Sequence, residues 1–239
     1  MKPSHFKGKE ALEHVIEARQ KGFAASAEVH GTELPGHYNA AADAAKETSL
    51  ILTILWTLSV SHQLSLFFLC GWLVWKVGRS AILGWSRLER LHRLIEEERW
   101  EIEHHRTQER AELTALYAAK GFSGKLLEEV IDVLMSDDNR LLQVMLEEEL
   151  GLTLGVYEHP LKQAAGASIG VAGAGLIMSF GLFFLPSWGP ALCSGLIIAL
   201  CSGTSAQLER NKVAPAIIWN LAVAALAALS AYLVAKAAV

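Results

Sequence analysis

The sequence predicts an all-α membrane protein with five transmembrane helices and a three-helix cytoplasmic domain between spans two and three. Of its 239 residues, 52% are hydrophobic, and the mean hydropathy is +0.29. Neither 163–208 nor 213–235 contains an Asp, Glu, Lys, Arg or His. Because a bilayer core requires about 20 apolar residues per helix, these runs predict membrane spans. The segment 86–159 is instead rich in Glu and helix formers, which predicts a soluble insert.

This pattern divides the chain into four regions. In the polar N-terminal region, apolar residues from Leu12 to Phe23 recur at helical spacing between charges. They predict an amphipathic helix that lies on a membrane surface or on a partner domain. The PSWGP stretch at 186–190 divides the long C-terminal apolar run. The regions are 1–38 with the amphipathic helix, 39–85 with spans one and two, the cytoplasmic insert 86–159, and 160–239 with spans near 164–185, 188–207 and 214–236.

The first apolar block, 48–75, leaves two arrangements open. It lacks Asp, Glu, Lys and Arg, and one helix of this length would measure about 42 Å. That is long for one span and short for two. We favour a hairpin that begins near Ala40 and turns at the polar SHQ stretch, 61–63. Asp43 and Glu47 then lie at the inner mouth of the first span, where ionisable residues indicate function.

Basic residues set the predicted orientation. Five of them lie between Lys76 and Arg93 and two lie in the loop 208–213, whereas PSWGP has none. The positive-inside rule therefore places the N-terminus, the insert and this loop in the cytoplasm. A net charge of −4 argues against a nucleic-acid partner. Three cysteines in apolar runs predict packing rather than a disulfide or metal site, namely Cys70, Cys193 and Cys201.

Three helices are expected in the insert, each with a recognisable end. The first runs over about 80–119 and is continuous with the second span. The other two cover 123–135 and 137–150. The residues that mark the ends are Gly121 after the first helix, Ser123 before the second, and Asp137 or Asp138 before and Gly151 after the third.

Four glutamates and a histidine share one face of the first helix. At 100° per residue they fall within an arc of about 80°. A solvated acidic face is one interpretation. A bound cation is the other, because clustered carboxylates repel one another and covering them raises that cost. The five residues are Glu98, Glu101, Glu109, Glu112 and His105.

The surroundings of this face favour a cation. Leu91 and Leu94 precede the glutamates and Leu116 follows them, so we expect another element to cover the stripe. The arginines within 99–110 fall off the arc. Carboxylates with an imidazole suit Fe²⁺, Mn²⁺ or Zn²⁺, and helical glutamates at this spacing build metal sites.

The third helix offers two further ligands. Met145 and Glu149 lie one turn apart and would complete the site if this helix packs on the first. A thioether favours Fe²⁺ over Mg²⁺ or Ca²⁺. Taken alone, Met145 is interpreted first as a core residue, and Glu147 and Glu148 are interpreted as an acidic patch.

Three motifs of the insert occur together: Glu98-x2-Glu101-x7-Glu109-x2-Glu112, LTALYAAKGF at 113–122 and MLEEELGL at 145–152. In this combination the chain resembles the vacuolar iron transporter family. The resemblance implies five spans, a three-helix cytoplasmic metal-binding domain, a homodimer, and exchange of Fe²⁺, often Mn²⁺, for protons. It also implies that the metal ligands are Glu98, Glu101, Glu109, Glu112, Met145 and Glu149.

The first two spans depart from the family pattern. The family usually has an Asp-Gly pair in the first span, whereas an alanine follows Asp43 here, and 64–78 contains no Met or Glu and only Lys76 as a charge. A translocation path needs ligands that replace the hydration shell of the ion. Asp43 and Glu47 from two subunits would supply four carboxylates. The far mouth offers Ser61, His62 and Gln63, although we interpret His62 first as a plain interfacial turn residue.

We therefore expect a transporter that moves Fe²⁺ or Mn²⁺ out of the cytoplasm in exchange for protons. No nucleophile constellation, phosphate loop or cofactor motif indicates an enzyme. The weak second span motivates a competing hypothesis, a membrane-anchored metal-binding sensor or scaffold that has lost transport. A purely structural membrane protein would require the glutamate face to be accidental. A bacterial cytoplasmic membrane and a vacuole-like membrane both fit.

Overall fold

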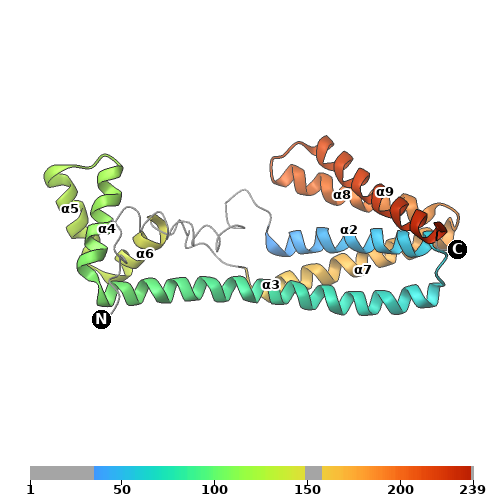
Figure 1. The fold of residues 1–239 in the computed structure, drawn as a ribbon, viewed down its shortest axis with the longest axis horizontal. Coiled ribbons are helices and arrows are strands. Elements are labelled where there is room, and N and C mark those ends of the chain that lie inside the picture. Colours follow the sequence, from blue (N-terminus) through green and yellow to red (C-terminus); the bar gives the residue numbers. More distant parts are fainter. Residues whose placement is uncertain (1–34, 149–157, 238–239) are drawn as a thin grey trace. The chain divides into compact units, whose positions relative to one another are not determined.

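The structure, a computed structural model, describes residues 35–148 and 158–237 (Figure 1). All regular elements in these residues are helices, which confirms the predicted all-α class for this part of the chain. The expected N-terminal amphipathic helix and the stop at Gly151 lie outside it. The helices are α2 (Gly36–Thr57), α3 (His62–His104), α4 (Arg106–Ala119), α5 (Gly124–Met135), α6 (Asp138–Glu148), α7 (Pro160–Phe184), α8 (Gly189–Leu208) and α9 (Val213–Ala237).

The chain divides into two compact units. The polar unit contains 86–148, with the end of α3 and helices α4, α5 and α6. The apolar unit contains 35–85 and 158–237, with α2, the start of α3, and helices α7, α8 and α9. Helix α3 therefore begins in the apolar unit and ends in the polar unit, as the predicted continuity of the second span with the insert requires.

The apolar block 48–75 folds as two helices joined by a turn. Helix α2 ends at Thr57 and α3 begins at His62. In the turn, Ser59 has a φ of 57°, and the N–H of Val60 donates to the carbonyl of Leu55 at 3.0 Å. The hairpin interpretation is therefore correct, but the turn precedes the SHQ stretch.

Four described helices, α3, α7, α8 and α9, are long and apolar enough to cross a membrane. They correspond to the predicted second, third, fourth and fifth spans. Helix α2 differs because Asp43, Lys46 and Glu47 lie near its middle, and its longest stretch without a charge is 48–57. Composition alone therefore supports four spans.

Helix α2 packs along α7 and also contacts α8 and α9. A methyl group added to Gly170 would lie 2.2 Å from the carbonyl oxygen of Ala41, and one added to Gly166 would lie 2.0 Å from that of His37. The two backbones thus meet where α7 has no side chains. Small residues allow this packing in a bilayer, so these glycines form a helix-packing face.

A carboxylate from the segment before α7 holds the first turn of α2. The backbone N–H of His37 donates to Glu158 Oε2 at 2.7 Å, and the ring Nδ1 of His37 contacts the other oxygen of the same carboxylate. A carboxylate at a helix N-terminus accepts from free N–H groups and complements the helix dipole. The starts of α2 and α7 are therefore joined.

Helix α3 contacts α2 and α7 through large side chains, one of which, Leu69, lies against Gly175 of α7. Leu69, Trp72 and Leu73 pack against a buried cluster of small residues on α2 and α7. Cys193 and Cys201 pack against a neighbouring apolar cluster, as predicted for the cysteines. Cys70 is exposed on α3 and does not share this role.

The close approach of α2 and α7 generates the first prediction. Gly170→Ala should destabilise the protein by about 1–3 kcal/mol, because overpacking forces the backbones apart. Gly173→Ala in the same helix is the matched control, since an added methyl group there meets nothing within 4 Å. The control should be neutral or stabilising. Thermal unfolding of both variants in detergent measures the difference, and equal midpoints would contradict the proposed contact.

Candidate metal site and charged membrane network

The helices of the polar unit share an apolar core. Met145 is fully buried in it, which establishes its structural role as a core residue. Leu91 and Leu116 are buried and Leu94 is partly buried, which confirms that the stripe carrying the glutamates is covered. The buried core residues are Leu91, Ile102, Leu113, Ile131, Leu141, Leu142, Met145 and Leu146.

The first predicted helix of the insert is wrong in one respect, since it is interrupted. Helix α3 ends at His104 and α4 begins at Arg106, with His105 between them at φ −129° and ψ 31°. A tertiary contact accompanies the break: Arg106 reaches Asp138 at 2.5 Å and the carbonyl of Met135 at 2.5 Å. Those contacts hold the start of α4 against the turn between α5 and α6.

The interruption divides the four glutamates between two helices. Glu98 and Glu101 lie on α3, and Glu109 and Glu112 lie on α4. The single arc of 80° therefore does not describe them. Three of them are nonetheless buried, with exposed fractions of 4% for Glu98, 1% for Glu109 and 0% for Glu112. Glu101 and His105 are half-buried.

The buried glutamates are donors of the kind a divalent cation requires, but the described residues do not assemble a complete site. Among them, no three His, Cys, Asp or Glu side chains converge closely enough to hold one ion. The predicted ligand Glu149 lies outside the described residues. The metal-ligand set thus stays a prediction, supported by the burial of Glu98, Glu109 and Glu112 and not by an observed cluster.

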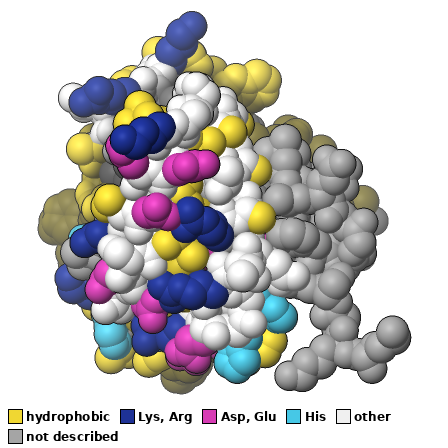
Figure 2. All heavy atoms as spheres, turned by 90° about the vertical axis from the view of Figure 1, so that its left-hand side faces the viewer, with side chains coloured by type: hydrophobic (Ala, Val, Ile, Leu, Met, Phe, Trp, Pro, Cys, Tyr) yellow, Lys and Arg dark blue, Asp and Glu magenta, His cyan; other side chains and the backbone are white. Residues whose placement is uncertain are grey.

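Two of the arginines that were predicted to lie off the glutamate face, Arg106 and Arg110, pair with aspartates on other helices. Arg106 contacts Asp138 on α6, and Arg110 contacts Asp132 on α5 at 2.5 Å. Figure 2 shows basic and acidic side chains interleaved on one face of the molecule, so neither sign dominates that surface. Arg106 and Arg110 therefore fix the helices of the polar unit rather than neutralise the buried glutamates.

A tyrosine at the end of α4 lies beside the acidic end of α6. Lys120 contacts the carboxylate of Glu148, and its Nζ lies 5.0 Å from the centroid of the Tyr117 ring. Burial, followed by the charge of Glu148, raises the pKa of Tyr117 above its usual value of 10.0. The predicted acidic patch at Glu147 and Glu148 thus acts on a neighbouring side chain.

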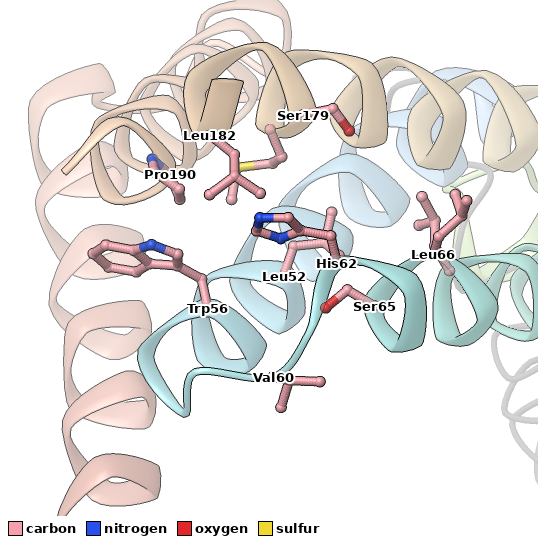
Figure 3. A pocket seen from close by; sticks show the side chains of 11 residues that line it. Leu52, Trp56, Val60, His62, Ser65, Leu66, Ser179, Leu182 and Pro190 are labelled. Atoms are coloured by element: carbon pink, nitrogen blue, oxygen red, sulfur yellow. The ribbon is translucent and has the colours of Figure 1, made fainter. Parts of the chain in front are cut away.

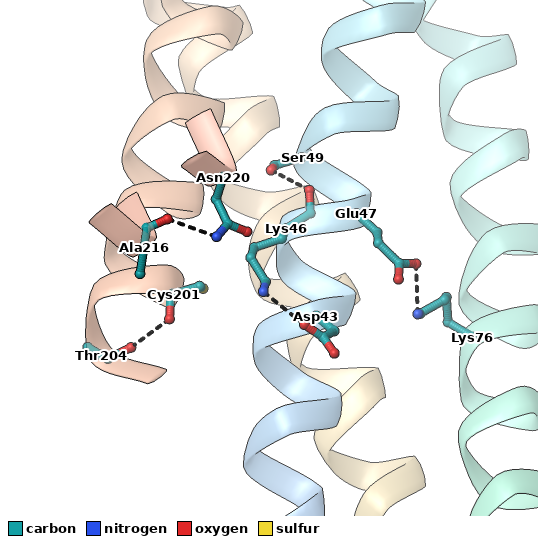
Figure 4. A network of polar contacts seen from close by, with 9 residues as sticks. All are labelled: Asp43, Lys46, Glu47, Ser49, Lys76, Cys201, Thr204, Ala216 and Asn220. Carbon is teal, nitrogen blue, oxygen red and sulfur yellow. Dashed lines mark hydrogen bonds and ion pairs between the residues drawn. The ribbon is translucent and has the colours of Figure 1, made fainter. Parts of the chain in front are cut away.

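The predicted path residues of the apolar unit are both paired with lysines (Figure 4). Asp43 Oδ1 lies 2.9 Å from Lys46 Nζ, and Glu47 Oε2 lies 2.7 Å from Lys76 Nζ. Glu47 lies near the middle of α2 rather than at its mouth. These two pairs were not predicted. The i, i+3 spacing of Asp43 and Lys46 and the isolated charge of Lys76 in an apolar helix could have indicated them.

His62 lines a cavity of about 110 Å³ between the α2–α3 hairpin and helices α7 and α8 (Figure 3). The lining is mostly apolar, and Ser65 and Ser179 join His62 as its polar members. Ser61, predicted at the same mouth, instead accepts from the N–H of Leu64 at 3.4 Å at the start of α3. Gln63 is exposed. His62 is itself exposed at the start of α3, so it borders an open pocket, and its interpretation as an interfacial turn residue stays open.

The environment of Tyr117 generates the second prediction. Because its pKa is raised, the neutral phenol stabilises the fold below pH 10, and this contribution is lost as the pH rises through the higher folded-state pKa. The tyrosinate absorbance of Tyr117 is the difference in absorbance between the wild type and Tyr117→Phe. This difference should therefore have its titration midpoint above pH 10. Glu148→Gln should move that titration down. A midpoint at or below 10, or no response to Glu148→Gln, would contradict the assignment.

Comparison with known proteins identifies the chain. None of the curated proteins compared with it matches. The model of the VIT family matches residues 54–236, well over half of the chain. The match includes Lys76 and the residues from Glu98 to Met145, and it begins after Asp43 and Glu47. The chain therefore belongs to the VIT family, the vacuolar iron transporters, and is an integral multi-pass membrane protein of a family that transports metal ions.

Proposed function

We propose that this protein carries divalent iron or manganese out of the cytoplasm in exchange for protons. Membership of a family of metal-ion transporters is the observation that carries the proposal. The burial of Glu98, Glu109 and Glu112 in the polar unit adds support, because buried carboxylates are costly unless they are compensated by hydrogen bonds, protons or cations.

The proposal includes α2 as a fifth membrane span. Its 22 residues correspond to about 33 Å of helix, enough to cross a bilayer core. Three spans, α7, α8 and α9, contact it, and its charges are paired with Lys46 and Lys76. Paired charges inside a bundle are the form in which membrane helices tolerate ionisable residues. A homodimer would bring two such helices into one transporter.

The polar unit would capture the ion on the cytoplasmic side. Glu98, Glu101, Glu109 and Glu112 would supply oxygen ligands, and Met145 and Glu149 would complete the set, with His105 as a further donor. A thioether beside carboxylates favours the softer Fe²⁺ over Mg²⁺ or Ca²⁺. Carboxylates also bind protons, and protonation releases the metal. The polar unit would then pass the ion to the path at Asp43 and Glu47.

Metal binding by the polar unit gives the third prediction. Mn²⁺ at about 100 times its dissociation constant should stabilise the protein by about 2.7 kcal/mol, because it binds only the folded state. Glu109→Gln/Glu112→Gln should lose this gain. Glu97→Gln/Glu103→Gln, at exposed positions of α3, is the matched control and should keep it. Thermal unfolding with and without Mn²⁺ measures the stabilisation. An equal rise in unfolding temperature in the wild type, the double variant and the control would refute the site.

Transport itself gives the fourth prediction. Proteoliposomes that contain the full chain should take up Fe²⁺ when a proton gradient is imposed, and Glu98→Ala/Glu109→Ala should reduce uptake at limiting Fe²⁺ by tenfold or more, about 1.4 kcal/mol or more. Glu97→Ala/Glu103→Ala is the control, with uptake equal to the wild type. Uptake that ignores the gradient would exclude proton exchange.

A second function is favoured by the lysine pairs of the membrane network, because Asp43 and Glu47 are already neutralised. In that case the chain is a membrane-anchored metal-binding sensor or scaffold. Asp43→Asn distinguishes the two functions. It should abolish Fe²⁺ uptake if the chain is a transporter, while Mn²⁺ stabilisation through the polar unit persists. Absence of uptake in the wild type, with that stabilisation intact, would establish the sensor or scaffold.

A further inference from the structure

Lys76 occupies the place of a cation beside Glu47 (Figure 4). Its Nζ lies 2.7 Å from Glu47 Oε2, and its side chain is only 11% exposed, against 44% for Glu47. The two residues come from different helices, α3 and α2. A long, flexible lysine gives up much rotamer entropy when it is held in one place. Its burial therefore indicates that the surroundings fix the ammonium group at the carboxylate.

Those surroundings are visible on both helices. The ammonium group of Lys76 lies 5.9 Å from the ring centroid of Trp72, within the range of a cation–π contact. Trp72 is itself fixed, because its indole Nε1 donates to Thr48 Oγ1 at 3.0 Å. Thr48 is fully buried next to Glu47. The hydrogen bond from Trp72 to Thr48 thus joins α2 and α3 beside the two groups that contact Lys76, the Glu47 carboxylate and the Trp72 ring.

A second lysine completes an electrically balanced group. Lys46 Nζ lies 2.9 Å from Asp43 Oδ1, one turn along α2 from Glu47. Two carboxylates and two ammonium groups carry no net charge, so their desolvation is partly compensated by their mutual attraction. A divalent cation that approached Asp43 and Glu47 with both ammonium groups in place would be repelled by them. That repulsion is weakened where the groups are exposed, as Asp43 and Glu47 are at 59% and 44%, and it is strongest at Lys76, which is 11% exposed.

We infer that Lys76 is a tethered counter-cation, which competes with the transported ion for the Glu47 carboxylate and so sets the ion concentration at which the membrane path fills. This inference rests on the proposed function, because it assigns an occupant to the same path. Lys76 is a positioning and specificity residue rather than a ligand. An ion enters the path only when it displaces the ammonium group from Glu47.

The experiment measures Mn²⁺ binding to the full chain in detergent, from the electron paramagnetic resonance signal of free Mn²⁺, together with uptake in proteoliposomes. Lys76→Gln should strengthen binding and lower the KM of uptake by on the order of tenfold, the usual size of coupling between sites. Lys76→Arg keeps the charge and should behave like the wild type. Lys212→Gln, in the exposed α8–α9 loop, is the matched control and should change neither quantity.

Glu47→Gln isolates the membrane path from the Mn²⁺ that the polar unit binds. In the Glu47→Gln background, Lys76→Gln should produce no further gain in Mn²⁺ affinity. If Lys76→Gln matches Lys212→Gln, or if Lys76→Arg gives the same gain as Lys76→Gln, the positive charge does not compete with the ion and the inference is wrong. Lys76→Met replaces Lys76→Gln if the latter does not stay monodisperse.

The outcomes for the inference and for the proposed function are distinguishable. A Glu47-dependent gain in Mn²⁺ affinity without uptake in any protein would overturn transport and support the counter-cation. Uptake in the wild type with no effect of Lys76→Gln on affinity or KM would support transport and overturn the counter-cation. Neither uptake nor a gain in affinity would overturn both.

Discussion

The close approach of α2 and α7 is the constraint on which the apolar unit depends. In lipid there is little hydrophobic gain from bringing two helices together, so contact depends on packing and on the polar groups that meet. Gly166 and Gly170 let the backbone of α7 touch the carbonyls of α2. Glu158 holds the first turn of α2 beside the start of α7. Together they keep a helix with three charged residues within the apolar unit.

The charges of α2 follow from that position. An unpaired carboxylate in an apolar bundle would be expensive, and the chain supplies one lysine from α2 and one from α3 instead. Trp72 serves two purposes, because it hydrogen-bonds to α2 and its ring lies close to Lys76. Large side chains of α3 such as Trp72 lie between α3 and α2 and separate the two helix backbones. The wider spacing leaves room for the lysine to reach Glu47.

The polar unit meets the problem of buried charge differently. Its arginines pair with aspartates on the outer helices, whereas Glu98, Glu109 and Glu112 lie inside beside an apolar core. The break at His105 lets α4 leave the line of α3, so the glutamates approach from two helices.

Apolar runs and their breaks determined the helical class, the second to fifth spans and the hairpin at 48–75, because hydrophobicity and helix-end signals are local properties. Gly121, with its positive φ of 97°, shows how reliable such a signal can be. The leucines at both ends of the glutamate stretch predicted that another element covers it, and Glu98, Glu109 and Glu112 are indeed buried. The interruption at His105 was not predictable, because it accompanies contacts of Arg106 with residues about thirty positions away.

The pairing of Glu47 with Lys76 likewise depends on the tertiary structure. The two residues lie on different helices, and the packing of α3 side chains such as Trp72 against α2 sets the distance between them. The sequence by itself determined which residues are charged and which segments are helices. The tertiary structure decided which charges meet, because that depends on how far apart the helices stand, and large or absent side chains set that spacing.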